Sequence, residues 1–258
     1  MLLGLRRYLV TFLACLSTFV SLVLIISFSI WWLFLLILIL WIASLLWLYF
    51  RFYSKTENFV VDIVMMITTV VSITGLILLV EWNLLRWLLL LLCVAFIGML
   101  FLKLHRTNQS LSFQQKPIRR IKMMLWVFDV YALLTILFAV SLFFPGIPFV
   151  LLALFGSVVC VFGAIFIWQM YYKIEKPKLV LWGILLGLIS FEFIWVIHLL
   201  PLGYLVLGFL VAWLWFIIQL FVRFHFSPKG IIWKKQLYFL LTNLFFNFLI
   251  LFFIVRWI

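Results

Sequence analysis

The sequence has few charged side chains and very few acids. Only 10% of its 258 residues are charged and six are Asp or Glu, whereas about a quarter of the residues of an ordinary soluble domain are charged. Hydrophobic residues make up 70% of the chain, too many for a water-soluble protein of this size to cover. The composition therefore excludes an ordinary water-soluble fold.

Several motifs of known chemistry are also missing. The chain contains no G-x-x-x-x-G-K-[ST], G-x-G-x-x-G, H-E-x-x-H or G-x-S-x-G pattern, so nucleotide-binding, zinc-peptidase and hydrolase functions have no residues to carry them. The three cysteines fall in apolar runs and form no C-x-x-C pair, which indicates packing residues. The sequence thus predicts no cofactor, no metal site and no catalytic residue, and it favours a protein that is not an enzyme.

Long apolar runs are what the sequence does contain. Runs of about 20 apolar residues are typical of helices that cross a hydrocarbon core about 30 Å thick. We predict an all-α, polytopic transmembrane helix bundle that forms a single integral membrane domain over residues 1–258, with no soluble domain. Nine spans are expected, at about residues 8–28, 31–50, 59–80, 84–102, 123–144, 149–171, 179–200, 204–222 and 237–255. An eight-span alternative stays open, because the first two spans share one unbroken apolar run that only "SFSIWW" divides.

The positions of the basic residues support this segmentation. With the N-terminus in the cytoplasm, 17 of the 19 Lys and Arg residues lie on inner segments, which leaves Arg86 and Arg256 outside. The outer turns "FSI", "EWN", "PGIP" and "PLG" are very short, so the spans pair as hairpins with a ninth helix added. We expect a bacterial inner (plasma) membrane protein whose C-terminus lies outside if it has nine spans. Glu81 and Arg86 flank the second outer turn and are expected to form a local ion pair.

The chain has a net charge of +13, and its basic residues lie between apolar runs and not along one solvated face. This placement predicts anionic lipid headgroups on the cytoplasmic side as partners, possible contacts with other membrane proteins, and no nucleic acid. The candidate lipid contacts are Lys116, Arg119, Arg120, Lys122, Lys229, Lys234 and Lys235.

Small residues mark the helix faces expected to pack closely, since helices in a bilayer associate through close fit. The clearest stripe, in span 149–171, comprises Ala153, Gly156, Cys160, Gly163 and Ala164. In span 179–200, Gly183, Gly187 and Ser190 share one face, and Glu192 lies about half a turn away from it. We therefore expect this span to be lined by protein on two sides and to be central in the bundle.

Polar residues inside the spans are few. Glu192 is the deepest acid, about 20 Å from the cytoplasmic start of its span, where a charge costs at least about 2.5 kcal/mol. Asn243 and Asn247 lie four positions apart at depths close to that of Asp129. These patterns give the hypothesis of an intramembrane polar site formed by Glu192, Asp129, Asn243 and Asn247. For each residue the sequence gives more weight to a structural role, as a protonated or hydrogen-bonded acid or as an amide that bonds a neighbouring helix.

Three functions are compatible with these features. The first is a non-enzymatic, membrane-embedded subunit or assembly protein that binds partners and anionic lipid. The second is a small transporter or permease subunit with a polar path around Glu192. The third and weakest is a lipid-modifying enzyme that uses Glu192 as acid or base, which requires a second catalytic group nearby.

Overall fold

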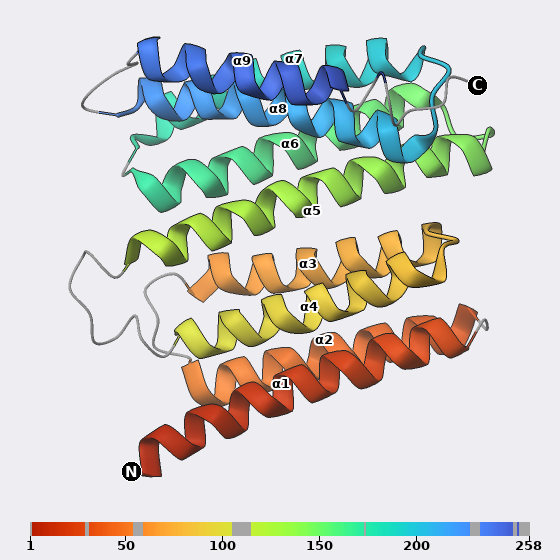
Figure 1. Cartoon of the computed structure of the whole chain (residues 1–258), viewed down its shortest axis with the longest axis vertical. Helices are drawn as coiled ribbons and strands as arrows, with labels where there is room; N and C mark the ends of the chain where they lie inside the picture. Colours follow the sequence, from red (N-terminus) through yellow and green to blue (C-terminus); the bar gives the residue numbers. More distant parts are fainter. Residues whose placement is uncertain are drawn as a thin grey trace. The chain divides into compact units, whose positions relative to one another are not determined.

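A computed structural model of the chain describes residues 2–28, 31–53, 59–104, 115–172, 174–227, 233–249 and 252. These residues form nine α-helices and no β-strand, which confirms the all-α prediction (Figure 1). The helices are α1 (Leu2–Ser27), α2 (Trp31–Tyr53), α3 (Phe59–Leu79), α4 (Asn83–Leu104), α5 (Gln115–Phe143), α6 (Phe149–Tyr171), α7 (Lys176–His198), α8 (Tyr204–His225) and α9 (Trp233–Leu249).

Eight of these helices, α1 to α8, are long and apolar enough to cross a membrane, which fits a multi-pass membrane protein. The predicted division of the first apolar run is confirmed, because α1 ends at Ser27 and α2 begins at Trp31. The described residues give eight candidate spans and not nine because the last helix, α9, is short. Helix α9 has 17 residues, and its apolar part, Gln236–Leu249, is shorter than the other candidate spans.

Helix α5 begins about eight residues before the predicted span. Its first turn contains Pro117, which a helix tolerates at its start because the first N–H groups have no partner within the helix. The hydropathy pattern placed Lys116, Arg119 and Arg120 in a loop, but they belong to this helical extension.

The chain divides into two compact units, residues Met1–Leu125 and Trp126–Ile258. In unit 1, α1 packs against α4 and α2, and α3 packs against α4. The indole Nε1 of Trp41 on α2 donates a hydrogen bond of 3.2 Å to Thr18 Oγ1 on α1. Helices α1 and α4 approach closely at Gly98, where an added Cβ would lie 2.8 Å from Cys15 Sγ. The core of unit 1 thus combines apolar packing with buried hydroxyl groups.

In unit 2, α6 packs against α7 and α8, and α7 packs against α8. The small stripe predicted on α6 is buried along its whole length, from Ala153 to Ala164. A Cβ at Gly156 would meet Ile194 of α7, and one at Gly163 would meet Val130 of α5. Trp215 Nε1 of α8 donates to the carbonyl of Cys160 at 2.9 Å. The predicted role of the stripe, a surface for close helix approach, is therefore confirmed.

Candidate functional site

Helix α7 presents two different faces. Its small face, with Gly183 and Ser190, is buried. A Cβ at Gly183 would contact Val161 and Ile165 of α6, and a Cβ at Gly187 would lie 3.0 Å from Val161. The glycines predicted to form a packing face do so, and they fix which side of α7 faces away from the bundle.

Glu192 lies on the exposed side of α7. The neighbouring side chains on this side, Leu188 and Val196, are each 60% exposed. Glu192 makes no hydrogen bond and no ion pair with any residue in the described part of the chain. Within unit 2, α7 packs against α6 and α8 and its face with Glu192 is exposed, so the expected protein contact on that face is not formed there.

The other members of the predicted polar site have different surroundings. Asp129 on α5 is completely buried, Asn247 on α9 is buried and Asn243 is partly exposed. Each Asn side chain bonds within its own helix: Asn243 Nδ2 donates to the carbonyl of Phe239, and Asn247 Nδ2 to that of Asn243, both at 2.8 Å. Each bond uses one of the amide N–H donors that the structural alternative assigned to a neighbouring helix. A shared role for Asp129, Glu192, Asn243 and Asn247 stays a prediction.

Two buried glutamines were missed by the sequence reasoning. Gln219 on α8 has no exposed surface, and the backbone carbonyl of this residue accepts a hydrogen bond of 3.1 Å from Trp168 Nε1. The side-chain amide of Gln219 bonds no described residue, and the same holds for the amide oxygen of Gln236 on α9. Gln219 is the only polar residue of "FIIQLF", and this isolation in an apolar run was the signal available.

Unit 1 contains a buried ion pair that the sequence did not predict. Lys122 Nζ on α5 contacts Asp62 Oδ1 on α3, and the two side chains are only 13% and 4% exposed. Tyr49 Oη on α2 donates a hydrogen bond of 3.5 Å to Asp62 Oδ2. Asp62 thus joins three helices, and its charge is balanced inside the chain. The sequence did not predict this role for Lys122, whose ammonium group neutralises Asp62, and its contact with a lipid headgroup stays a prediction.

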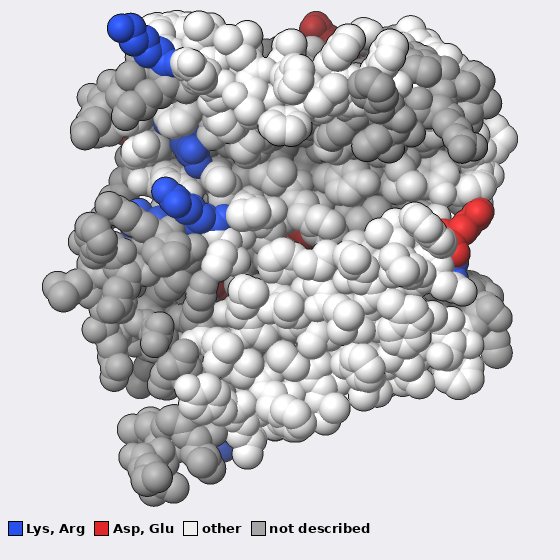
Figure 2. All heavy atoms as spheres, in the orientation of Figure 1, with Lys and Arg blue, Asp and Glu red and all other residues white. Residues whose placement is uncertain are grey.

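The remaining candidate lipid contacts are placed as follows. Arg120 and Lys234 are exposed, and Arg119 is partly exposed. Lys116 and Lys235 lie in α5 and α9, but their side chains are outside the described residues, as is the whole of Lys229. On the face seen in Figure 2, most of the described surface between the helix ends is uncharged.

No group of three His, Cys, Asp or Glu residues in the described ranges is arranged to hold a metal ion. Cys15, Cys93 and Cys160 are free thiols. The chain matches no protein-family model, no curated protein and no solved structure.

Proposed function

We propose that the protein is a non-enzymatic, membrane-embedded subunit that binds a helix of a partner membrane protein through the exposed face of α7. This α7 face comprises Leu185, Leu188, Glu192, Trp195 and Val196, all of them exposed. The observation that carries the proposal is the position of Glu192, a carboxyl group on the outside of a helix that is apolar enough to span a membrane.

Glu192 lies deep in its helix. It precedes His198, the last residue of α7, by six positions, or about 9 Å along the helix. Insertion into the membrane centre costs about 2.5–3.5 kcal/mol for an acid such as Asp, and less toward the interface. No described residue of the chain offsets this cost for Glu192. A partner helix with a Lys, Arg, Asn or Gln side chain at the same depth would offset it by supplying a cation or a hydrogen-bond donor.

The alternative functions have less support. A transport path would place Glu192 among other polar side chains inside the bundle, whereas it lies on the uncovered face of α7. A lipid-modifying enzyme requires a second catalytic group within hydrogen-bond reach of Glu192, and no described residue occupies that position. A surface that binds a partner helix requires neither polar neighbours inside the bundle nor a second catalytic group.

Photo-cross-linking in native membranes tests the proposal. A photoreactive amino acid in place of Leu188, one turn from Glu192, is expected to give one discrete protein adduct. The same amino acid at Leu151 on α6 is the matched control, because Leu151 is 58% exposed and Leu188 is 60% exposed. We expect Leu151 to give adducts with lipid only.

The dependence on the carboxyl group separates specific binding from chance contact. Glu192→Leu is expected to abolish the adduct at Leu188, whereas Glu192→Gln, which keeps hydrogen-bonding capacity, should retain part of it. Lipid adducts alone at Leu188, or a protein adduct that survives Glu192→Leu unchanged, would overturn the proposal.

Contacts with anionic lipid form a second part of the proposal. Arg120 and Lys234 are exposed near the starts of α5 and α9, where cations lie close to headgroups in a membrane. Lys116, Arg119, Lys229 and Lys235 belong to the same proposal through their positions in the sequence. Each exposed cation contributes about 1 kcal/mol to binding of an anionic surface, so binding should weaken as salt is raised.

A further inference from the structure

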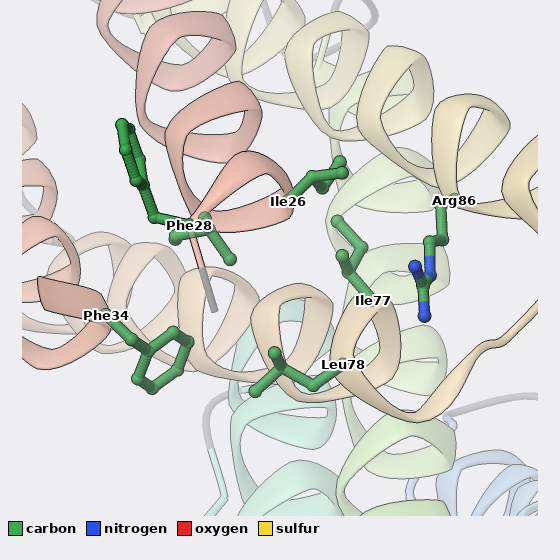
Figure 3. A pocket seen from close by; sticks show the side chains of 7 residues that line it. Ile26, Phe28, Phe34, Ile77, Leu78 and Arg86 are labelled. Atoms are coloured by element: carbon green, nitrogen blue, oxygen red, sulfur yellow. The ribbon is translucent and has the colours of Figure 1, made fainter. Parts of the chain in front are cut away.

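Unit 1 contains a cavity of about 290 Å³ at the end where α1 is followed by α2 and α3 by α4 (Figure 3). Its walls are apolar and come from α1, α2, α3 and the residue after α1. Buried Ile25 and Ile77 line it together with Phe28 and Leu78, which are 47% and 53% exposed. The cavity therefore has a buried apolar part and exposed apolar residues at its edge.

Arg86 of α4 is the one charged side chain that lines this cavity. In Figure 3 it lies beside Ile77, whereas Phe28 and Phe34 occupy the other side of the view. The guanidinium Nε donates to the backbone carbonyl of Val80, which holds the side chain against the end of α3. The expected ion pair between Glu81 and Arg86 is not formed, since Arg86 makes no other hydrogen bond or ion pair with a described residue.

The guanidinium therefore keeps hydrogen-bond donors for another group. An arginine has five N–H donors, and within the described part of the chain only the one on Nε has an acceptor. The paired N–H groups suit two oxygens of one phosphate, which they can bind in a bidentate manner. Arg86 is half-buried, so a bound anion would be partly shielded from water and salt.

The size and walls of the cavity limit what its ligand can be. Sites for whole small molecules have volumes of about 300–1,000 Å³, so a cavity of about 290 Å³ suits a slender apolar group. Helices α1 to α4 are each able to span a membrane, so their ends lie near the headgroup layer when they do. An acyl chain would fill the apolar part of the cavity, and a phosphate attached to it would bind the guanidinium of Arg86.

We propose that this cavity binds an anionic phospholipid, with one acyl chain between α1, α2 and α3 and the headgroup phosphate on Arg86. The site lies wholly in unit 1 and does not depend on the α7 face. It also gives a reason for a cation in the first turn of α4, at the opposite end of this helix from Lys103.

Native mass spectrometry of the full-length protein tests this proposal. The detergent-purified protein is titrated with phosphatidylglycerol, and in parallel with glycerol phosphate, which lacks acyl chains. One phosphatidylglycerol molecule is expected to stay bound, with no comparable binding of glycerol phosphate. Arg86→Gln should weaken binding about tenfold or more, because hydrogen bonds to a charged group contribute about 1.5–3 kcal/mol each. Arg86→Lys should retain part of the affinity.

Two further variants separate the site from general charge effects. Ile26→Trp places a large side chain in the cavity from a half-buried position and should lower binding while Arg86 is intact. Arg51→Gln removes an exposed cation in the last turn of α2 and should leave this tightly bound lipid in place. Binding by Arg86→Gln as tight as that of the wild type, or an equal loss in Arg51→Gln, would overturn the proposal. If Ile26→Trp does not fold, the comparison of Arg86→Gln with Arg51→Gln decides the matter.

Discussion

Two acids in helices that are apolar enough to span a membrane, Asp62 in unit 1 and Glu192 in unit 2, have opposite surroundings. Asp62 is buried, pairs with Lys122 and accepts a hydrogen bond from Tyr49. Glu192 is exposed and has no ionic or hydrogen-bonded partner among the described residues. Asp62 is thus neutralised within the chain, whereas we propose that Glu192 binds a partner helix.

The largest effect is expected from breaking the pair in unit 1. Lys122→Met leaves the Asp62 carboxyl group buried without its cation, and loss of one partner of a buried pair costs about 3–5 kcal/mol. The free energy of unfolding, measured in mixed detergent micelles, should fall by this amount. The double variant Asp62→Asn/Lys122→Met should recover most of the loss, because Asn has no charge to balance. A double variant as unstable as Lys122→Met would contradict this account of the pair.

A smaller effect is expected from tightening a helix contact in unit 2. A Cβ at Gly208 of α8 would lie 2.8 Å from both the Cα and the backbone N of Thr135 on α5, and backbone atoms cannot move aside as a side chain can. Gly208→Ala should therefore lower the free energy of unfolding by about 1–3 kcal/mol through overpacking.

Gly203→Ala is the matched control for this contact. Gly203 precedes α8 with a φ of −65°, and an added Cβ there would have no other atom within 4 Å. Its effect should stay within about 0.5 kcal/mol. Equal effects of Gly203→Ala and Gly208→Ala would show that the close approach to Thr135 is not what limits position 208.

The smallest effect on stability is expected at Glu192 itself. Glu192→Leu removes no hydrogen bond or ion pair with a described residue, so the unfolding free energy of the purified chain should change by no more than about 0.5 kcal/mol. The same detergent assay as for Lys122→Met measures it. A loss as large as that of Lys122→Met would remove the contrast between the two acids and give Glu192 a structural role within the chain.

The sequence predicted much of the helical architecture because hydropathy and small-residue spacing are local signals. The turn in "SFSIWW", the α6 stripe and the glycine face of α7 were all found from residue order alone. Helix ends were less accurate where charged residues continue a helix, as in the first turns of α5. Hydropathy measures transfer into lipid and not helix formation, so it misses a helical extension made of basic residues.

The candidate sites were harder to predict, since polar residues far apart in sequence give no sign of their partners. Lys122 and Asp62 are 60 positions apart. Lys122 was predicted to bind a lipid headgroup because it belongs to the same basic segment as Arg119 and Arg120. The sequence placed Glu192 about half a turn from Gly183, but it did not show that this side of α7 would be exposed.

The sequence alone determined that the chain forms apolar helices long enough to cross a membrane, and on which faces of α6 and α7 the small residues lie, but it left eight or nine spans open. These properties follow from composition and from the fixed angle of about 100° between successive residues of a helix. Only the tertiary structure decided that Asp62 is neutralised within the chain, that Glu192 faces outward and that Arg86 borders an apolar cavity. Each of these depends on which helices pack together, and packing partners are selected by shape complementarity along whole helices and not by any single residue.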